Sequence, residues 1–268
     1  MMKRKPVVAG KFYSGMPGKL RSEIEGMVKK GATREKAIGL ISPHAGYPFS
    51  GPVAGATLSR VEFTDTFVIM GPNHSGMGAP FAIMTSGSWE TPLGNVEIDS
   101  EMGAVILEKS GYLEEDQGAH AYEHSIEVQL PFLQYFNETV KIVPITLGPS
   151  SGTVYKKIGI SIADALRQLE ERAVIMASSD MTHYESQESA ETKDTMAIES
   201  ILEMDEDKLL NQIERYNITM CGYGPVVALI AAAKSLGAKE AELVQYRTSG
   251  DATGDYSSVV GYAGIIFK

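Results

Sequence analysis

Three histidines stand where a sheet would place catalytic or metal-binding side chains. Each follows a short, uninterrupted aliphatic run by a few residues: His44 after 38–41, His74 after 67–70 and His183 after 173–177. Runs of this kind are typical of strands that are buried on both faces of a sheet. Because ligands bind beyond the carboxyl ends of such strands, we expect the three imidazoles to meet at one edge of one sheet.

His44 and His74 lie in turns that would hold their rings in place. Pro43 and Gly46 flank His44, and glycines surround His74 on both sides. Neutral imidazoles at adjacent strand ends are suitable ligands for a borderline metal ion. The residues alone leave one alternative open for each histidine. For His44, the alternative is a cap on the next helix. For His74, it is a glycine-rich turn that binds an anion through its N–H groups.

A carboxylate and a thiol complete this set of reactive side chains. Asp180 precedes His183 by three residues. Three roles are open for its carboxylate: it ligates a metal, it orients the imidazole for proton transfer, or it caps a helix start. Cys221 lies in a glycine-rich loop that opens the next helix, where the helix dipole would lower the pKa of its thiol. We expect a ligand or a nucleophile, and the alternative is an inert core residue.

A fourth cluster matches a pattern known from zinc proteases. His120, Glu123 and His124 fit H-x-x-E-H, in which two histidines on one helix face bind zinc and the glutamate is the general base. The pattern requires regular helix, and we expect a kinked helix from about residue 121. The alternative interpretation places His124 and Glu127 in the same pocket as the strand-end histidines.

The overall composition is acidic and restricts the class of partner. Of 268 residues, 34 are acidic and 24 are basic, which gives a net charge of -10. No basic cluster extends beyond residues 3–5, so binding to nucleic acid is disfavoured. No apolar stretch approaches the length of a membrane span. A lone cysteine fits a reducing compartment, and we expect a cytoplasmic protein without a membrane partner.

Strands and helices alternate along most of the chain, which predicts an α/β fold. We expect a single domain over residues 1–268, layered helix–sheet–helix, with a mixed, largely parallel central sheet. The expected strands are 37–42, 66–71, 81–85, 140–146, 173–180, and an antiparallel pair at 243–247 and 257–267. The expected helices are 17–28, one opening at Pro52, 100–109, 154–169, 187–203, 205–216 and 224–236.

Five motifs in order, and the start of the chain, resemble the Memo family. The motifs are Pro43-His44-Ala45-Gly46-Tyr47, Gly71-Pro72-Asn73-His74, Glu123-His124-Ser125-Ile126-Glu127, Ser178-Ser179-Asp180-Met181-Thr182-His183-Tyr184 and Cys221-Gly222, preceded by Ala9-Gly10-Lys11-Phe12-Tyr13. The resemblance covers essentially the whole chain. It implies a fold similar to that of the class III extradiol dioxygenases, which use non-haem iron(II). Prokaryotic members are identified as component B of the AmmeMemoRadiSam system, which implies a functional link to a radical SAM protein.

The resemblance also implies roles for individual residues. His44, His74 and Cys221 would be the metal ligands. His183 would be the acid/base residue, with Asp180 beside it. The residues expected to contact a small-molecule or peptide ligand are Phe12, Tyr13, Tyr47, Asn73, His124 and Tyr184.

One departure from the dioxygenases affects the expected chemistry. Their ligands are two histidines and a carboxylate, whereas Cys221 would supply a thiolate here. A thiolate is softer and shifts the preference from iron towards copper or zinc. Dioxygenase activity on catechols therefore does not follow from the resemblance, and the sequence leaves open whether the protein is an enzyme.

Three functions are consistent with these residues. The first is a metal-dependent redox enzyme that uses iron(II) or copper, with zinc as a further possibility. The second is a non-catalytic protein that binds an anionic or phosphopeptide-like ligand in the same pocket, because a fold does not determine a function. The third is a hydrolase that depends either on zinc at His120 and His124 or on the thiol of Cys221, with His183 as base.

Overall fold

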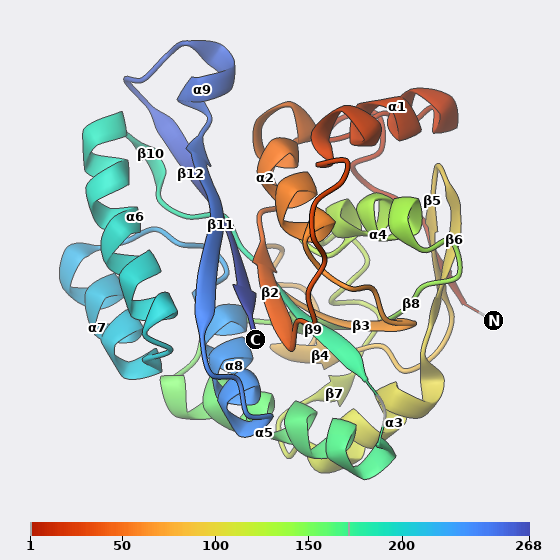
Figure 1. Cartoon of the computed structure of the whole chain (residues 1–268). Helices are drawn as coiled ribbons and strands as arrows, with labels where there is room; N and C mark the ends of the chain where they lie inside the picture. Colours follow the sequence, from red (N-terminus) through yellow and green to blue (C-terminus); the bar gives the residue numbers. More distant parts are fainter. Residues whose placement is uncertain (1, 171) are drawn as a thin grey trace.

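The centre of the fold is a set of parallel strands that lie side by side in one sheet (Figure 1). The computed structural model describes residues 2–170 and 172–268. The four central strands, in spatial order, are β8 (Lys141–Leu147), β3 (Thr66–Pro72), β9 (Ala173–Ser178) and β2 (Gly39–Ser42). Each pair of neighbours among them is parallel. The aliphatic runs of the sequence therefore form adjacent strands, as expected.

Further strands extend the sheet on both sides. On one side, β12 (Val259–Phe267) pairs antiparallel with β2, β11 (Ala241–Thr248) and β10 (His183–Glu185). On the other side, β6 (Gly94–Ile98) is parallel to β8 and forms a hairpin with β5 (Ser88–Thr91). The short strands β1 (Lys3–Arg4), β4 (Phe81–Ile83) and β7 (Glu114–Glu115) complete it. The sheet is mixed and largely parallel, which confirms the predicted fold class.

Helices cover both faces of this sheet (Figure 1). One layer consists of α1 (Pro17–Met27), α2 (Tyr47–Ser59) and α4 (Leu130–Phe136). The opposite layer consists of α3 (Ser100–Lys109), α5 (Gly152–Leu169), α8 (Tyr223–Ser235), α6 (Gln187–Leu202) and α7 (Glu206–Tyr216). The short α9 (Gly250–Thr253) lies between β11 and β12. Within residues 2–170 and 172–268, no helix is both long and apolar enough to cross a membrane.

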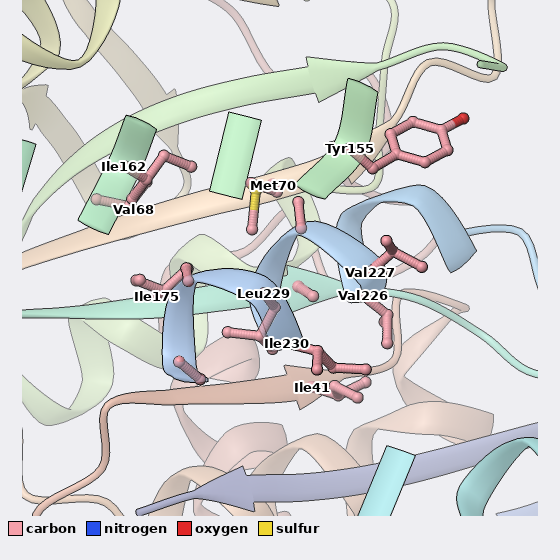
Figure 2. Close-up of a cluster of buried hydrophobic side chains, with 14 of the residues drawn as sticks. Ile41, Val68, Met70, Tyr155, Ile162, Ile175, Val226, Val227, Leu229 and Ile230 are labelled. Atoms are coloured by element: carbon pink, nitrogen blue, oxygen red, sulfur yellow. The ribbon is translucent and has the colours of Figure 1, made fainter. Parts of the chain in front are cut away.

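Each central strand divides its side chains between two cores. On β3, Phe67 and Ile69 belong to the core beneath α1 and α2, whereas Val68 and Met70 belong to the core beneath α5 and α8. Figure 2 shows the second core, where Leu229 of α8 packs towards the sheet. Because successive side chains of a strand point to opposite faces, a strand between two helix layers must be apolar throughout. This burial fixes the register that sets where each strand ends.

The prediction of a helix from about residue 121 is wrong. Residues 118–126 form turns, followed by a single 3-10 turn, η1 (Glu127–Gln129), and then α4. The carboxylate of Glu123 accepts the backbone N–H groups of His124 and Ser125, which holds the chain in turns. Pro131 lies in the first turn of α4 and causes no kink, since the missing N–H has no helical partner there.

The start of the second helix also differs from the prediction. α2 begins at Tyr47 rather than near Pro52, and Pro48 occupies its first turn. Pro52 lies inside the helix. The preference of proline for a first helical turn, which predicted a start at Pro52, is met four residues earlier by Pro48.

A buried ion pair connects the N-terminal segment to the loop before α4. Arg4 and Glu127 form this pair at 2.7 Å, with side chains that are 5% and 0% exposed. Arg4 also donates to the backbone carbonyls of His120 and Glu123, at 2.8 and 2.5 Å. Its guanidinium stacks over Trp89, 4.0 Å from the ring centroid. One buried cation therefore fixes the loop that carries Glu123.

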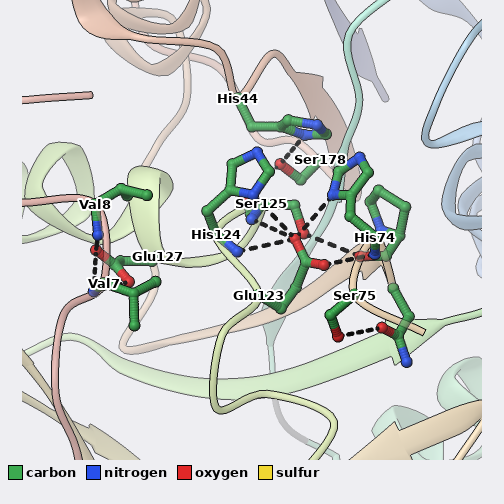
Figure 3. Close-up of polar contacts among 12 residues, drawn as sticks. Val7, Val8, His44, His74, Ser75, Glu123, His124, Ser125, Glu127 and Ser178 are labelled. Atoms are coloured by element: carbon green, nitrogen blue, oxygen red, sulfur yellow. Dashed lines mark hydrogen bonds and ion pairs between the residues drawn. The ribbon is translucent and has the colours of Figure 1, made fainter. Parts of the chain in front are cut away.

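Glu127 forms its hydrogen bonds with this N-terminal segment and does not face the pocket of the strand-end histidines. Its carboxylate accepts the backbone N–H groups of Val7 and Val8 and the hydroxyl of Tyr13. Figure 3 shows it on the side of the loop that faces Val7 and Val8, away from the three imidazoles. The expectation that His124 and Glu127 share one pocket is therefore correct only for His124.

We predict that Arg4→Ala lowers the free energy of unfolding by about 3 kcal/mol, because it leaves a buried carboxylate without its cation. Arg21→Ala is the matched control, since Arg21 pairs with Glu138 at the surface. It should change stability by less than about 1 kcal/mol. Urea denaturation of both variants measures the difference, and equal losses would contradict the assigned role of Arg4.

Candidate metal centre

The carboxyl ends of three adjacent parallel strands bring the predicted histidines together. β2, β3 and β9 end at Ser42, Pro72 and Ser178 on the same edge of the sheet. A cavity of about 670 Å³ lies at this edge, and His44, His74, His124 and His183 all line it. The ring centroids of His44 and His74 are 5.3 Å apart. The expected convergence of the strand-end histidines is confirmed.

Cys221 reaches the same point from the loop before α8. Its sulfur lies 3.2 Å from Nε2 of His44. Ligand atoms of His44, His74 and Cys221 lie within 4.8 Å of one another, close enough to surround one metal ion. These are the three residues expected as ligands, and the structure brings them into one group.

Hydrogen bonds determine which nitrogen of His44 is available to a ligand. The hydroxyl of Ser178 donates to the backbone carbonyl of Ser125 and accepts from the amide of Gln129, at 2.7 and 2.8 Å. Its second lone pair must then accept the Nδ1–H of His44, at 3.0 Å. This tautomer leaves the lone pair of Nε2 directed at Cys221. Burial, and then the neighbouring imidazoles, hold the pKa of His44 well below its usual value, so the ring is neutral.

Glu123 orients His74 in the same way (Figure 3). Its carboxylate accepts Nδ1–H of His74 at 2.9 Å and the backbone N–H of His74 at 2.6 Å. Burial raises the pKa of Glu123, but the hydrogen bonds from His74 and Ser125 outweigh it and hold the pKa at about 2. The carboxylate is therefore ionised and acts only as an acceptor, so the neutral ring of His74 carries its proton on Nδ1 and its lone pair on Nε2. A carboxylate behind an imidazole is typical of metal-binding histidines.

His74, Glu123 and His124 form a second close group of potential ligands. Both oxygens of Glu123 are already engaged by ring and backbone N–H groups, which favours an orienting role over metal binding. The ring of His124 stacks on His74 at 4.9 Å and meets the edge of Phe12 at 5.0 Å. His124 therefore forms part of the cavity wall.

His120 does not join its H-x-x-E-H partners. It is fully buried, its ring packs against Trp89, and neither ring nitrogen has a hydrogen-bond partner among the described residues. Burial lowers its pKa to about 4. Since His120 lies outside the donor groups and the segment is not helical, the zinc-protease interpretation is wrong.

Asp180 connects the turn of His44 to the loop of Cys221. Its carboxylate accepts the backbone N–H groups of His44 and Ala45, at 2.7 and 3.3 Å. Its own N–H donates to the sulfur of Cys221 at 3.3 Å. Burial raises the pKa of Asp180 to about 6. Asp180 holds two loops together and caps no helix, because the short strand β10 follows it.

His183 lines the cavity but is not one of the grouped ligands. Its Nδ1 lies 2.9 Å from the backbone carbonyl of Thr219, which can only accept a hydrogen bond. The ring therefore donates from Nδ1 and keeps the lone pair of Nε2. Its backbone N–H also donates to the hydroxyl of Thr219 at 2.7 Å. An imidazole whose Nδ1–H is held in this way presents Nε2 as the site for proton transfer with a bound molecule.

Burial reverses the expected effect of the helix dipole on Cys221. The sulfur lies at the start of α8, but desolvation raises the pKa of the thiol well above its usual value, and the carboxylate of Asp180 raises it further. The prediction of a lowered thiol pKa is therefore wrong for the protein without a cation beside the sulfur.

The six residues expected to contact a ligand divide into three groups. Phe12, His124 and Tyr184 line the large cavity. Tyr13 and Tyr47 are buried behind it and donate to Glu127 and to the backbone carbonyl of Val128, which opposes direct ligand contact. Asn73 accepts the N–H of Gly76 and donates to the carbonyl of Met77, so its side chain shapes its own turn.

Sequence reasoning missed the residues that lie behind His44. Gln129 accepts the hydroxyl of Ser42 and donates to Ser178 and to the carbonyl of Pro43, all in the buried interior. Ser178 is the last residue of β9, and its position between an aliphatic run and Asp180 was a usable signal. Gln129 carries no such signal, because its partners are distant in the sequence.

The fold and the donor set define a class: an α/β protein with an open, largely parallel sheet and a His/His/Cys group at its carboxyl edge. A family model described as "Memo-like protein" matches residues 4–266. A MEMO1 family protein of Methanopyrus kandleri is 46% identical over 100% of this chain and 99% of its own length. One of Methanothermobacter thermautotrophicus is 44% identical over 98% and 99%. The chain belongs to the Memo family.

Tyr184 at the cavity has an unfavourable backbone conformation. It lies at a bulge in β10, has a φ of 60°, and is 78% exposed. We predict that Tyr184→Gly is more stable than Tyr184→Ala by about 1 kcal/mol, because glycine adopts positive φ without strain. At the control position, the exposed Tyr122, the alanine variant should be at least as stable as the glycine variant. Urea denaturation of the four variants tests this, and the same order at both positions would contradict it.

Proposed function

We propose that the protein is a metal-binding redox protein whose ligands are His44, His74 and Cys221. The observation that carries the proposal is the convergence of these three donor atoms within 4.8 Å. Both imidazoles use Nδ1–H for a protein acceptor, which leaves both Nε2 atoms for a cation. Such second contacts hold a ligand ring in position before metal arrives.

Two imidazoles and one thiolate suit copper and zinc best, and they can also hold iron. A bound copper or iron ion would supply one-electron chemistry at the floor of the large cavity. The thiolate distinguishes this donor set from two histidines and a carboxylate, so the substrate of the related dioxygenases is no part of the proposal.

The protein's own groups would bind the second reactant and handle its protons. Phe12 and His124 offer ring faces and edges to an organic molecule in the cavity. His183 would take a proton on Nε2, since the carbonyl of Thr219 holds Nδ1–H. Asp180 would act mainly as a positioning residue, because its hydrogen bonds fix the turn of His44.

We predict that the protein binds one equivalent of copper(II) or iron(II), and that Cys221→Ser combined with His74→Ala abolishes this binding. His183→Ala is the control and should retain the metal. Elemental analysis of protein purified without oxygen, with the copper(II) absorption spectrum, measures both. Full occupancy in a correctly folded double variant would overturn the ligand assignment.

We predict that Glu123→Gln weakens metal binding about 10- to 100-fold, because the amide orients His74 less strongly than the carboxylate does. Glu115→Gln is the matched control, since Glu115 is exposed and, among the residues that the structure describes, accepts only from the backbone of Thr85. Competition with a chelator of known affinity gives both dissociation constants. Equal affinities would show that Glu123 plays no part in holding the metal.

One contact favours a second function, a thiol-dependent hydrolase. The sulfur of Cys221 lies 3.2 Å from Nε2 of His44, which would make His44, rather than the expected His183, the base for this nucleophile. The raised thiol pKa opposes it. Alkylation by iodoacetamide separates the two functions. A ligand is protected in the metal-loaded protein and modified after chelation, whereas a nucleophile is modified rapidly in both states.

The large cavity alone would also serve a protein that binds an anionic or phosphopeptide-like ligand without turnover. Ligand-dependent stabilisation against melting, with no dependence on metal, would favour that function. The lone cysteine supports a reducing compartment such as the cytoplasm. A functional link to a radical SAM protein rests on the family resemblance, and co-purification would test it.

A further inference from the structure

A second, smaller cavity adjoins the candidate metal centre. Its volume is about 180 Å³, against about 670 Å³ for the large cavity. Both cavities are lined by His74 and Cys221, and by no other residue in common within 2–170 and 172–268. We call the smaller one the side pocket. Two of the three proposed ligands are therefore reached from two separate spaces.

The order of the strands explains why the two cavities lie on different sides. Along the carboxyl edge the strands run β8, β3, β9, β2. The large cavity is built beyond β9 and β2, where Asp180 and His44 lie. The side pocket is built beyond β3 and β8, from Pro72 and Leu147, and is completed by the start of α8 at Pro225. His74 and Cys221 stand at the boundary between them.

The lining of the side pocket is unsuited to a charged ligand. None of its described lining residues is an aspartate, glutamate, lysine or arginine. Pro72, Leu147 and Pro225 contribute hydrocarbon, and Tyr155 contributes its ring. The hydroxyl of Tyr155 already donates to the carbonyl of Gly148 and accepts the N–H of Ser150. Of the other polar side chains on the lining, the amide of Asn73 is engaged in its own turn, which leaves the hydroxyl of Tyr223 beside the proposed ligands His74 and Cys221.

The side pocket is also held at a small size by close packing. A Cβ on Gly224 would lie 2.6 Å from the ring of Tyr155, so only glycine allows α8 to approach this closely. Leu147 is 3% exposed and lies at the end of β8. The pocket has about a quarter of the volume of the large cavity, about 180 Å³ against about 670 Å³. An organic ligand that fills the large cavity would not fit.

We propose that the side pocket binds small uncharged molecules of the dissolved diatomic gas class and delivers them to His74 and Cys221. An organic ligand would occupy the large cavity at the same time, so the two reactants need not share one route. The delivery step rests on the proposed metal centre, whereas binding of gas in the pocket does not.

Xenon tests the binding step, because it is an apolar probe of similar size that needs no metal. We expect xenon in the side pocket of metal-free crystals of the wild type and of Leu147→Met, which keeps the volume of the side chain. Leu147→Phe should lose it by filling the pocket. Pro149→Trp, at the exposed rim, should also lose it and guards against misfolding of the first variant. A wild-type side pocket without xenon, or xenon retained in both bulky variants, would overturn the proposal.

Nitric oxide tests the delivery step on the iron(II)-loaded protein. Stopped-flow absorbance should show several-fold slower association in Leu147→Phe and Pro149→Trp than in Leu147→Met, with equal iron content and the same final spectrum. Unchanged rates in variants that have lost xenon would overturn delivery through the side pocket. If the protein takes up neither iron(II) nor copper(II), the metal centre is wrong, and the xenon result still decides whether the pocket binds a small apolar molecule.

Discussion

The site depends on one constraint: β3, β9 and β2 are parallel neighbours that are buried on both faces. Parallel pairing puts the carboxyl ends of the three strands on one edge of the sheet. Burial between two helix layers fixes the register, because a shift by one residue would move each side chain to the opposite core. His44, His74 and Asp180 can therefore meet although they lie far apart in the sequence, and the loops beyond the strands need only hold them in place.

Buried polar side chains hold these loops in place, and each accepts hydrogen bonds from one particular part of the site. Glu123 accepts a hydrogen bond from the ring of His74, and Ser178 accepts one from the ring of His44. Asp180 accepts the backbone N–H of His44 in the turn that carries this residue. A buried carboxylate is stable only when N–H groups surround it, so the burial of Glu123 enforces the turns around it. The hydrogen bonds to Ser178 and Glu123 also determine which ring nitrogen carries the proton in His44 and in His74. The position of the rings and the availability of their Nε2 atoms thus have a common cause.

The sequence predicted the central strands and the meeting of the histidines, since aliphatic runs followed by polar turn residues carry both. From its loop, Cys221 was expected as a ligand or a nucleophile, and only the family resemblance placed it with His44 and His74, because no spacing relates that loop to the strand ends. Glu123 was noticed for the wrong reason, as the base on a helix that does not form. Gln129 could not be found, since its interactions with Ser42 and Ser178 join segments separated by 87 and 49 residues. Long-range polar contacts leave no periodic trace in one sequence.

The environment of Cys221 favours a ligand over a nucleophile. A nucleophilic cysteine requires a thiolate in the resting protein, which a neighbouring cation normally stabilises. Here the neighbouring imidazole of His44 is neutral, and both burial and the carboxylate of Asp180 raise the thiol pKa. A metal ion between Cys221 and the two imidazoles would remove this penalty, because its charge stabilises the thiolate directly. Metal binding would then release the thiol proton, which couples the affinity of the site to pH. The raised thiol pKa makes Cys221 a poor nucleophile, and a bound cation would lower that pKa.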